Sequence, residues 1–427
     1  MKILVRQATI ADPNSTFNGQ VTDILIDGQL ISKMAPNISE PADEIIEAAG
    51  LTVSPGWVDI FSHFCDPGFE YKETLETGAA AAAAGGFTHV FVLPNTKPVV
   101  DSKTQVEYIS QQSRLLPVSI HPLGAITKNN EGKDLAEMYD MKNSGAIAFS
   151  DGLNPVQSPG LFLKALQYVK AFDGVLIQVP VDKSIGAGGL INEGVISTRL
   201  GLPGIPALAE EVIIKRDIDL LRYTQSKLHI TGVSTQSSLA LIQAAKLEGL
   251  NITCSVTPYH LFFCDEDLQT YDTNLKVNPP IRGKSDMFAL REGVMNGAVD
   301  CIASHHLPQD WDNKICEFEY AKNGMTGLET SFAVINHLLP ELTIDRLVKL
   351  FCLNARTIFN LPATNISEGS EAELTLFIRE GITILTKQQL QTKSSNTPFL
   401  ERELKGKVLG IINKGNPFIN KIVNTIL

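Results

Sequence analysis

The sequence lacks long runs of charge, and this excludes several classes of partner. Only 19% of its 427 residues are charged, and the formal net charge of -11 arises without an acidic or basic block. A surface that binds nucleic acid or an anionic membrane needs clustered Lys and Arg. We therefore expect no nucleic-acid partner and no membrane partner, and favour small molecules or proteins.

The sequence also lacks the features of a secreted or membrane protein. Its six cysteines show no paired spacing, and several lie in apolar runs, as is usual for reduced, buried thiols. The N-terminus has no apolar core of about 7–15 residues such as a signal peptide carries, and no segment approaches about 18 uninterrupted apolar residues. We expect a cytoplasmic protein.

The two ends of the chain contain short β-type runs. Residues 2–5, 21–26 and 30–34 alternate with Asn18-Gly19 and Asp27-Gly28, which suit hairpin turns. These runs predict a small antiparallel sheet within residues 1–54. Similar runs return at residues 373–378 and 407–412. We expect residues 366–427 to complete one β-rich accessory domain together with residues 1–54.

The middle of the chain, residues 55–365, has the pattern of repeated βα units. Apolar, often β-branched runs alternate with segments of helical period, which is typical of a parallel sheet covered by helices. Eight such units are the number found in a TIM barrel. The sequence therefore predicts an α/β fold, a (β/α)₈ TIM barrel with an accessory sheet. The eight runs lie near residues 57–63, 88–93, 117–125, 146–150, 175–179, 228–233, 252–256 and 300–304.

Several motifs, spread over nearly the whole chain, resemble those of one enzyme family in matching order. They are PGWVDIFSHFCDPG (residues 55–68), AFSDG (148–152), VTPYHL (256–261), KVNPP (276–280), CIAS (301–304), GLET (327–330) and NTPF (396–399). The sequence thus resembles the dihydroorotases of the amidohydrolase superfamily. The resemblance implies the same barrel fold. It also implies the activity of the family, which is the zinc-dependent hydrolysis of cyclic amides.

The resemblance also implies a metal site whose ligand positions are altered in this chain. The family holds one or two zinc ions at the C-terminal ends of the strands, and its first strand carries His-x-His. Here that motif reads Phe61-Ser62-His63, so one imidazole is lost. Val179 stands at the family's fifth-strand histidine, and Gly232 at the second histidine of the sixth strand. His305 replaces the eighth-strand aspartate that serves as metal ligand and general base.

Positions that bind substrate in the family are altered as well. Cys65 replaces an arginine that holds the substrate carboxylate, and a thiol cannot offer the forked pair of donors of a guanidinium. Gln309 replaces a histidine of the substrate loop. Asn95 and Asn278 match positions that line the substrate site or its rim. Turn formation beside Pro94 and Pro279 is the alternative explanation for these two asparagines.

Three candidate metal ligands remain, namely His63, Asp151 and His305. Asp151 matches the bridging carboxylate of the family, although the usual Asp-Asp-Gly is shortened to Asp151-Gly152. With Cys65 they could form a mononuclear zinc site, in which His305 takes the place of the base. The alternative is that they are hydrogen-bonded relics in a closed pocket. Strand alternation allows only one of His305 and His306 to face inward.

These substitutions lead to three hypotheses. The first is a non-catalytic dihydroorotase homologue of pyrimidine biosynthesis, with no cofactor or at most one weakly held zinc, that acts as a structural or regulatory partner. Because family members commonly associate with aspartate transcarbamoylase, that enzyme is the expected partner, and we also expect a homo-oligomer. The second is an active dihydroorotase, or another cyclic-amide hydrolase, that uses a rebuilt metal site. The third is a small-molecule sensor that retains the pocket.

Overall fold

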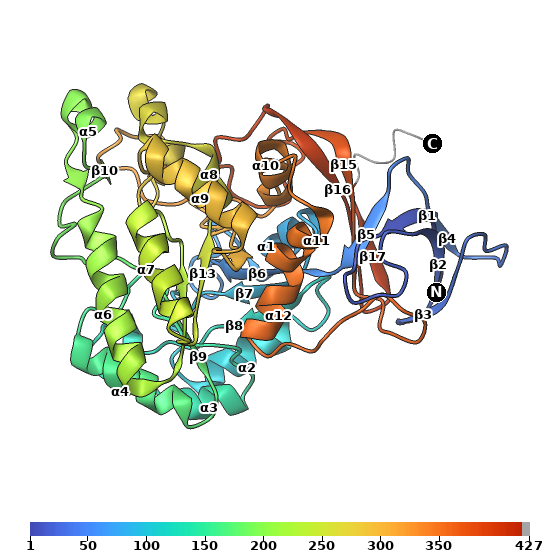
Figure 1. Ribbon diagram of the computed structural model, residues 1–427, viewed down its shortest axis with the longest axis horizontal. Coiled ribbons are helices and arrows are strands. Elements are labelled where there is room, and N and C mark those ends of the chain that lie inside the picture. The colour runs from blue at the N-terminus through green and yellow to red at the C-terminus, as the bar shows by residue number, and fades with distance from the viewer. Residues whose placement is uncertain (421–427) are drawn as a thin grey trace.

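The computed structural model describes residues 1–420, and consists of a barrel with a sheet at one side (Figure 1). The predicted C-terminal part of the accessory domain, residues 366–427, includes residues 421–427, which lie outside the described part. Seven of the eight predicted apolar runs form parallel strands. These are β6 (Trp57–Ser62), β7 (Phe87–Val92), β8 (Ser119–Pro122), β9 (Val175–Gln178), β12 (Lys227–Thr231), β13 (Ile252–Val256) and β14 (Cys301–Ile302).

The strands close into a barrel through single bridges between two sheets, of order β6-β7-β8 and β9-β12-β13-β14. The fourth predicted run is not a strand of its own, because only Phe149 pairs with both neighbours, bridging Gly124 and Leu176. On the other side Ser62 pairs with His306. The chain therefore forms the predicted (β/α)₈ TIM barrel.

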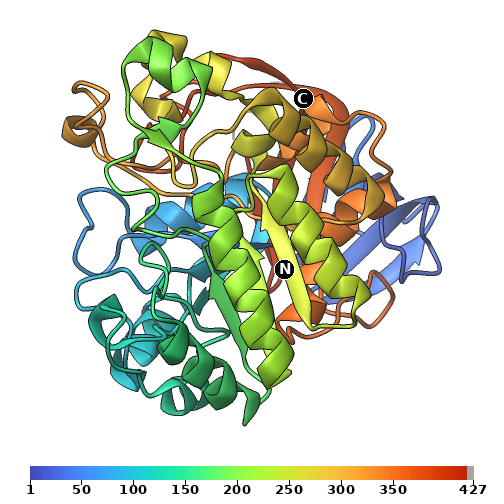
Figure 2. The same cartoon turned by 60° about the vertical axis from the view of Figure 1, so that its left-hand side comes forward.

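Helices surround the strands on the outside of the barrel, as Figure 2 shows for its second half. Several begin after a threonine whose side chain caps the helix, for example Thr74 before α1 and Thr235 before α7. The helices are α1 (Leu75–Ala84), α2 (Lys103–Gln112), α3 (Met138–Asn143), α4 (Pro159–Lys170), α5 (Val195–Leu200), α6 (Leu208–Thr224), α7 (Gln236–Leu247), α8 (Pro258–Phe262), α9 (Lys284–Asn296), α10 (Ser331–Leu338), α11 (Ile344–Val348) and α12 (Asn354–Ile358).

The two chain ends build one accessory sheet, as predicted. Its order is β17-β16-β15-β5-β1-β2-β3, with β4 beside β1, and the antiparallel pair of β5 and β15 joins the two ends. The sheet is not purely antiparallel, because β1 pairs in parallel with β4 and β5. Its strands are β1 (Lys2–Ile10), β2 (Val21–Asp27), β3 (Leu30–Ala35), β4 (Glu44–Ile46), β5 (Thr52–Pro55), β15 (Leu374–Ile384), β16 (Glu403–Asn413) and β17 (Asn416–Ile419).

The sheet is attached to the N-terminal end of the barrel by an aromatic cluster. Trp57, the first residue of β6, lies with its ring centroid 5.1 Å from Phe332, 5.0 Å from Phe351 and 5.3 Å from Phe377. All four side chains are buried, so the cluster removes a large apolar area from water. Because Phe377 belongs to β15 and Trp57 to β6, this cluster connects the two parts of the molecule.

A buried carboxylate stands at the same junction. Glu373, just before β15, accepts a hydrogen bond from Thr88 Oγ1 at 2.7 Å, lies 2.9 Å from His89 Nε2 and forms an ion pair with Arg356. Burial alone would raise the pKa of Glu373, but the contacts with His89 and Arg356 outweigh it and lower that pKa to about 2. The carboxylate is therefore ionised, and its Oε1 makes all three contacts.

The expectations about thiols and membrane spans can be compared with the fold. All six cysteines are unpaired, and Cys254, Cys301 and Cys352 are buried in the core as their apolar surroundings indicate. Among residues 1–420, no helix has the length and apolar character that a membrane crossing requires.

Candidate functional site

A pocket of about 210 Å³ lies at the C-terminal ends of the barrel strands. This is the end of a TIM barrel at which active sites are built. One wall is apolar and includes Phe61, Leu93, Leu153, Val179, Val277 and Leu307. The polar residues that border the pocket include Tyr259, Asn278, His305, His306, Gln309 and Lys322. Two of the altered ligand positions, Phe61 and Val179, thus contribute apolar surface where the resemblance implies imidazoles.

Phe61 and His305 pack against each other at the base of the pocket. Their ring centroids are 4.4 Å apart with an interplanar angle of 31°. Both side chains are buried. The phenyl ring of Phe61 therefore fills space beside His305 at a position where the family places a metal-binding imidazole.

Gly232 lies against His305, so little space is left for a side chain at position 232. Its φ of +75° lies in the left-handed region, and a Cβ at this position would lie 2.6 Å from His305 Cε1. That separation is far below van der Waals contact, so His305 in this orientation occupies the space that a side chain at position 232 needs. The replacements at 61, 232 and 305 therefore form one interlocking set.

His305 is held by a chain of hydrogen bonds from the barrel interior. His229 Nε2 is 3.0 Å from Ser255 Oγ, Ser255 Oγ donates to Thr231 Oγ1 at 2.8 Å, and Thr231 Oγ1 is 2.8 Å from His305 Nε2. Burial, followed by the neighbouring His260 and His229, lowers the pKa of His305 to about 3. His305 is therefore a neutral imidazole across the physiological range.

The turn at His305 changes the geometry on which the strand-alternation argument for His305 and His306 depends. Both residues border the pocket, because β14 ends at Ile302 and the chain turns at His305 with φ +44°. Alternation applies only while the backbone stays extended. The loop that follows the strand thus brings both residues to the border of the pocket, where the His305 ring packs on Phe61 and the His306 ring contacts Glu73.

His63 is engaged by backbone groups on both sides of its ring. Its Nδ1 accepts the Cys65 N–H at 2.8 Å, and its Nε2 lies 3.1 Å from the Asn95 carbonyl oxygen. Burial lowers the pKa of His63 to about 4. Cys65, with φ +61°, has its Sγ 3.9 Å from the His63 carbonyl oxygen, and burial raises the pKa of its thiol. Neither side chain presents a free ligand atom to the pocket.

Asp151 is committed to the loop that follows the third barrel strand. One carboxylate oxygen accepts the N–H groups of Ile126 at 2.8 Å and Thr127 at 2.9 Å, and the other accepts the Thr127 hydroxyl. Burial raises the pKa of Asp151 to about 6, which these hydrogen bonds only partly oppose. The carboxylate of Asp151 therefore holds the loop at Ile126 and Thr127.

The structure does not gather His63, Asp151 and His305 into one cluster. Within residues 1–420, no three or more side chains of His, Cys, Asp and Glu are grouped so that they could hold a metal ion. A catalytic zinc needs about three protein ligands with free lone pairs and an open position. The side chains present therefore do not fit the zinc that the resemblance implies.

The two candidate substrate-binding asparagines have different surroundings. Asn95 donates to the Asp151 carbonyl oxygen at 3.0 Å and accepts the Leu153 N–H at 3.0 Å, so its amide fixes the 151–153 turn. Asn278 borders the pocket, and its side-chain amide has no hydrogen-bond partner among the described residues. Only Asn278 is placed to meet a ligand.

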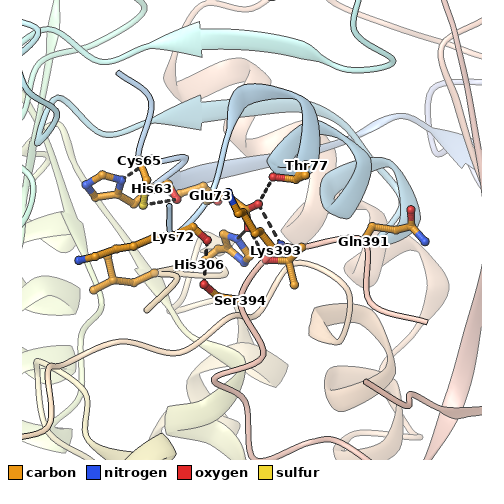
Figure 3. Close-up of polar contacts among 12 residues, drawn as sticks. His63, Cys65, Lys72, Glu73, Thr77, His306, Gln391, Lys393 and Ser394 are labelled. Atoms are coloured by element: carbon orange, nitrogen blue, oxygen red, sulfur yellow. Dashed lines mark hydrogen bonds and ion pairs between the residues drawn. The ribbon is translucent and has the colours of Figure 1, made fainter. Parts of the chain in front are cut away.

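Sequence reasoning missed a polar network beside the pocket, shown in Figure 3. Glu73 lies at its centre and accepts hydrogen bonds from the Thr77 and Thr392 hydroxyls and from Lys393 N at 3.1 Å. His306 accepts the Gly327 N–H at Nδ1, so its Nε2–H faces Glu73 at 3.3 Å. Glu73 lies next to a quoted motif, but only the fold brings residues 391–394 over it.

A second carboxylate, the partly buried Glu329, holds the same segment. It accepts the backbone N–H groups of Gln391 at 2.9 Å and Thr392 at 3.2 Å. Burial raises the pKa of Glu329 to about 7, although these two hydrogen bonds oppose the shift. Residues 391–393 are therefore held by Glu73 and Glu329 together.

Gln309, at the position of the family's loop histidine, also has a fixed role. Its Oε1 accepts from Lys72 Nζ at 3.0 Å, and its Nε2 donates to the Asn323 carbonyl oxygen at 2.8 Å. His260, which also lies near the mouth, is 2.9 Å from Thr257 Oγ1 and 3.1 Å from the Pro279 carbonyl oxygen. Both side chains are thus fully engaged in holding loops.

Comparison with known proteins shows which family this chain resembles in sequence. A family model described as dihydro-orotase-like matches residues 50–238. The dihydroorotase of Syntrophus aciditrophicus (strain SB) is 39% identical over 420 residues, which cover 97% of this chain and 98% of the relative. That of Thermoanaerobacter sp. (strain X514) is 40% identical over 413 residues, 96% of this chain and 95% of the relative.

Solved structures share the architecture at lower identity. The L-hydantoinase (dihydropyrimidinase) from Arthrobacter aurescens superposes with a TM-score of 0.86 at 22% identity, covering 98% of this chain and 96% of the other. The dihydropyrimidinase from Brevibacillus agri NCHU1002 superposes with a TM-score of 0.82 at 19% identity, covering 99% and 96%. At these identities the likeness concerns the fold alone.

Proposed function

Because this chain belongs to the dihydroorotase family, we propose that it is a non-catalytic member of that family, with a structural or regulatory role in pyrimidine biosynthesis. The interlock of Phe61, Gly232 and His305 is the single observation that carries this proposal. Phe61 and Gly232 have no lone pair to offer a metal, and His305 in its present orientation occupies the space that a side chain at position 232 would need.

The remaining polar groups support the same conclusion. Hydrolysis of a cyclic amide by this fold requires a metal to polarise the carbonyl and activate water, and a base worth typically about 10²–10⁴ in rate. Both ring nitrogens of His63 and both carboxylate oxygens of Asp151 already have partners. His305 is neutral but is held by Thr231 at one ring nitrogen.

The decisive assay is hydrolysis of dihydroorotate by the purified chain, with and without added zinc. We expect no turnover above the uncatalysed background in either case. A rebuilt metal site would instead give turnover that zinc sustains and that His63→Ala abolishes, and this result would overturn the proposal. Lys322→Ala, at the exposed rim of the pocket, is the matched control in that case.

We further propose aspartate transcarbamoylase as the partner, and a homo-oligomeric state for the chain, on the basis of the family resemblance. Exposed aromatic and apolar side chains near the mouth favour a protein contact there, since Trp and Tyr are enriched at interfaces. Trp311 is 64% exposed, Ile315 57% and Tyr320 70%.

Co-purification with the transcarbamoylase of the same cell tests this part of the proposal. Trp311→Ala combined with Tyr320→Ala should weaken the association. Leu247→Ala, a residue 90% exposed at the end of α7, should not. A chain that is a monomer by light scattering, and that does not bind the transcarbamoylase, would contradict both the proposed oligomer and the proposed partner.

A further inference from the structure

We propose that a second pocket, between the loop that follows β14 and residues 387–396, binds a nucleoside phosphate, a molecule that joins an aromatic base to a phosphate group. This pocket, which we call the lysine pocket, has a volume of about 340 Å³ and has Gln309 in common with the pocket described above. The inference goes beyond the proposed function and does not depend on it, because neither the chemistry of the family nor a partner role requires a ligand here.

The lysine pocket carries a surplus of positive charge in a chain whose formal net charge is -11. Lys314, Lys387 and Lys393 line it together with one carboxylate, Asp310, which accepts from the side-chain amide of Asn313. Within residues 1–420, none of the three ammonium groups forms an ion pair, and each gives at most one of its three N–H donors to a protein acceptor. The pocket therefore offers several charged donors to an anion.

Lys314 is the lysine that most requires a counter-charge. The residue is only 6% exposed, and its Nζ donates to the Thr273 carbonyl oxygen at 2.8 Å. Burial lowers the pKa of Lys314 to about 7, the Asp272 carboxylate opposes this shift in part, and the Lys276 ammonium adds to it. Buried ammonium groups are normally paired with an anion. Phosphate oxygens in the lysine pocket would supply the counter-charge that Lys314 lacks.

Trp311 supplies the second part of the site, which is an aromatic surface. The residue is 64% exposed and borders the lysine pocket, and Lys387 Nζ lies 5.3 Å from its ring centroid. Tyr71 is also exposed and borders the same pocket. Nucleic-acid bases of every kind stack on such aromatic rings. An aromatic ring beside unpaired ammonium groups therefore matches a base that carries a phosphate.

The size of the lysine pocket and its neutral polar groups suit a single nucleotide. Its volume of about 340 Å³ lies within the range of about 300–1,000 Å³ that is usual for small-molecule sites. Asn274 and Ser395 border the pocket, and their side chains have no hydrogen-bond partner among the described residues. Amide and hydroxyl groups both donate and accept, so these two can serve the hydroxyl groups of a ribose.

Titration calorimetry with matched ligands tests the proposal. Uridine monophosphate (UMP) and adenosine monophosphate (AMP) are compared with uridine and adenosine, which lack the phosphate, and with inorganic phosphate, which lacks the base. We expect one nucleotide or both to bind at least about tenfold more tightly than the matching nucleoside and than inorganic phosphate. Absence of nucleotide binding at millimolar concentration, or nucleotides that bind no more tightly than either fragment, would overturn the inference.

An oligonucleotide distinguishes a free nucleotide from a nucleic acid, which carries the same chemistry. We expect hexauridylate to bind no more tightly than UMP, because the lysine pocket has room for one base and one phosphate. Tighter binding of hexauridylate would assign the lysines to a nucleic acid and would overturn the proposal of a free nucleotide.

Three variants locate the ligand on the protein. Lys387→Met removes an exposed ammonium and should weaken nucleotide binding by about fivefold or more. Trp311→Ala should reduce nucleotide binding to the level of inorganic phosphate. Lys322→Met, at the rim of the other pocket, is the control and should leave binding within about twofold. A larger loss from Lys322→Met than from Lys387→Met would place the anion in the other pocket and contradict the proposal.

Proton uptake tests the part that Lys314 takes in binding. At pH 8 an amine with a pKa of about 7 is mostly neutral, and a bound anion raises that pKa, so nucleotide binding should take up about half a proton or more. Calorimetry in Tris and in HEPES, which differ in ionisation enthalpy, measures this uptake. Equal heats in the two buffers, after correction for dilution, would contradict the role of Lys314.

Two variants at this position separate binding from folding. Lys314→Arg, which is charged at every pH used, should keep nucleotide binding and lose the proton uptake. Lys314→Met should lose the uptake and weaken binding as well. Unchanged uptake in Lys314→Arg would show that another group takes up the proton and would overturn the assignment, and this variant serves even if Lys314→Met does not fold.

Discussion

The two ends of the barrel have opposite characters. At the N-terminal end, Glu373 is ionised and paired with Arg356, and the Trp57 cluster joins barrel to sheet. At the C-terminal end, Phe61 and Val179 line the pocket with apolar surface, and His305 is buried as a neutral ring. In TIM barrels the first end serves stability and the second serves chemistry. The comparison teaches that the charged network that stabilises the fold and the pocket with its apolar wall lie at opposite ends of the same barrel.

Glu373→Ala should give the largest effect, because it breaks the network at the N-terminal end. Removing one partner of a buried ion pair typically costs about 3–5 kcal/mol, since Arg356 is left buried without a counter-charge. The urea midpoint of unfolding measures the loss. Glu380→Ala, on the adjoining strand β15, is the control, because Glu380 is 80% exposed in its pair with Lys405 and should change little. Equal losses from the two variants would contradict the role given to the junction.

The pH dependence of stability should have opposite signs at the two ends. The pKa of Glu373 is lowered from 4.5 to about 2, so its ionised form stabilises the fold above about pH 4.5, and this contribution is lost as the pH falls towards 2. The pKa of Glu329 near the mouth is raised from 4.5 to about 7, so the folded state loses stability as the pH rises from 4.5 to 7. Each pKa shift corresponds to a change of about 3 kcal/mol in the free energy of unfolding over its pH range.

Glu373→Gln and Glu329→Gln test these signs. Relative to the unchanged chain, Glu373→Gln should flatten the fall in stability below pH 4.5, and Glu329→Gln should flatten the fall between pH 4.5 and 7. Urea midpoints measured from pH 3 to pH 8 give both slopes. If the two variants changed the profile in the same pH range, the proposed contrast between the ends would be wrong.

Gly232→Ala should have a smaller effect, about 2 kcal/mol, at the mouth. The residue has φ +75° and the added Cβ would lie 2.6 Å from His305 Cε1. In a His305→Ala background the loss should shrink by about 1 kcal/mol, because the clash is removed. Gly249→Ala is the control, since Gly249 has φ +83° and nothing within 4 Å of an added Cβ. If Gly232→Ala and Gly249→Ala lowered the free energy of unfolding by the same amount, the steric contact between positions 232 and 305 would have no role in stability.

Much of the fold could be predicted from the sequence, because apolar periodicity and turn residues act locally. The barrel and the shared sheet followed from these patterns. The fourth strand could not be predicted as a single bridge at Phe149, since that depends on how two neighbouring sheets meet. The extended pattern of CIAS also gave no signal that the chain turns at His305.

The candidate site was predictable in part for a similar reason. Motif order identified which positions differ, and hence Phe61, Val179, Gly232 and His305. The steric exclusion between Gly232 and His305 could not be predicted, because it joins two strands that are far apart in the sequence. The hydrogen bonds that occupy His63 and Asp151 come from neighbouring loops, so the sequence motifs alone left these residues open as ligands.

The zinc content of the chain purified without added metal tests the central claim most directly. Elemental analysis should find well below one zinc per chain, because no three ligand side chains within residues 1–420 are grouped to hold it. About one tightly held zinc per chain, lost on His63→Ala, would contradict the account.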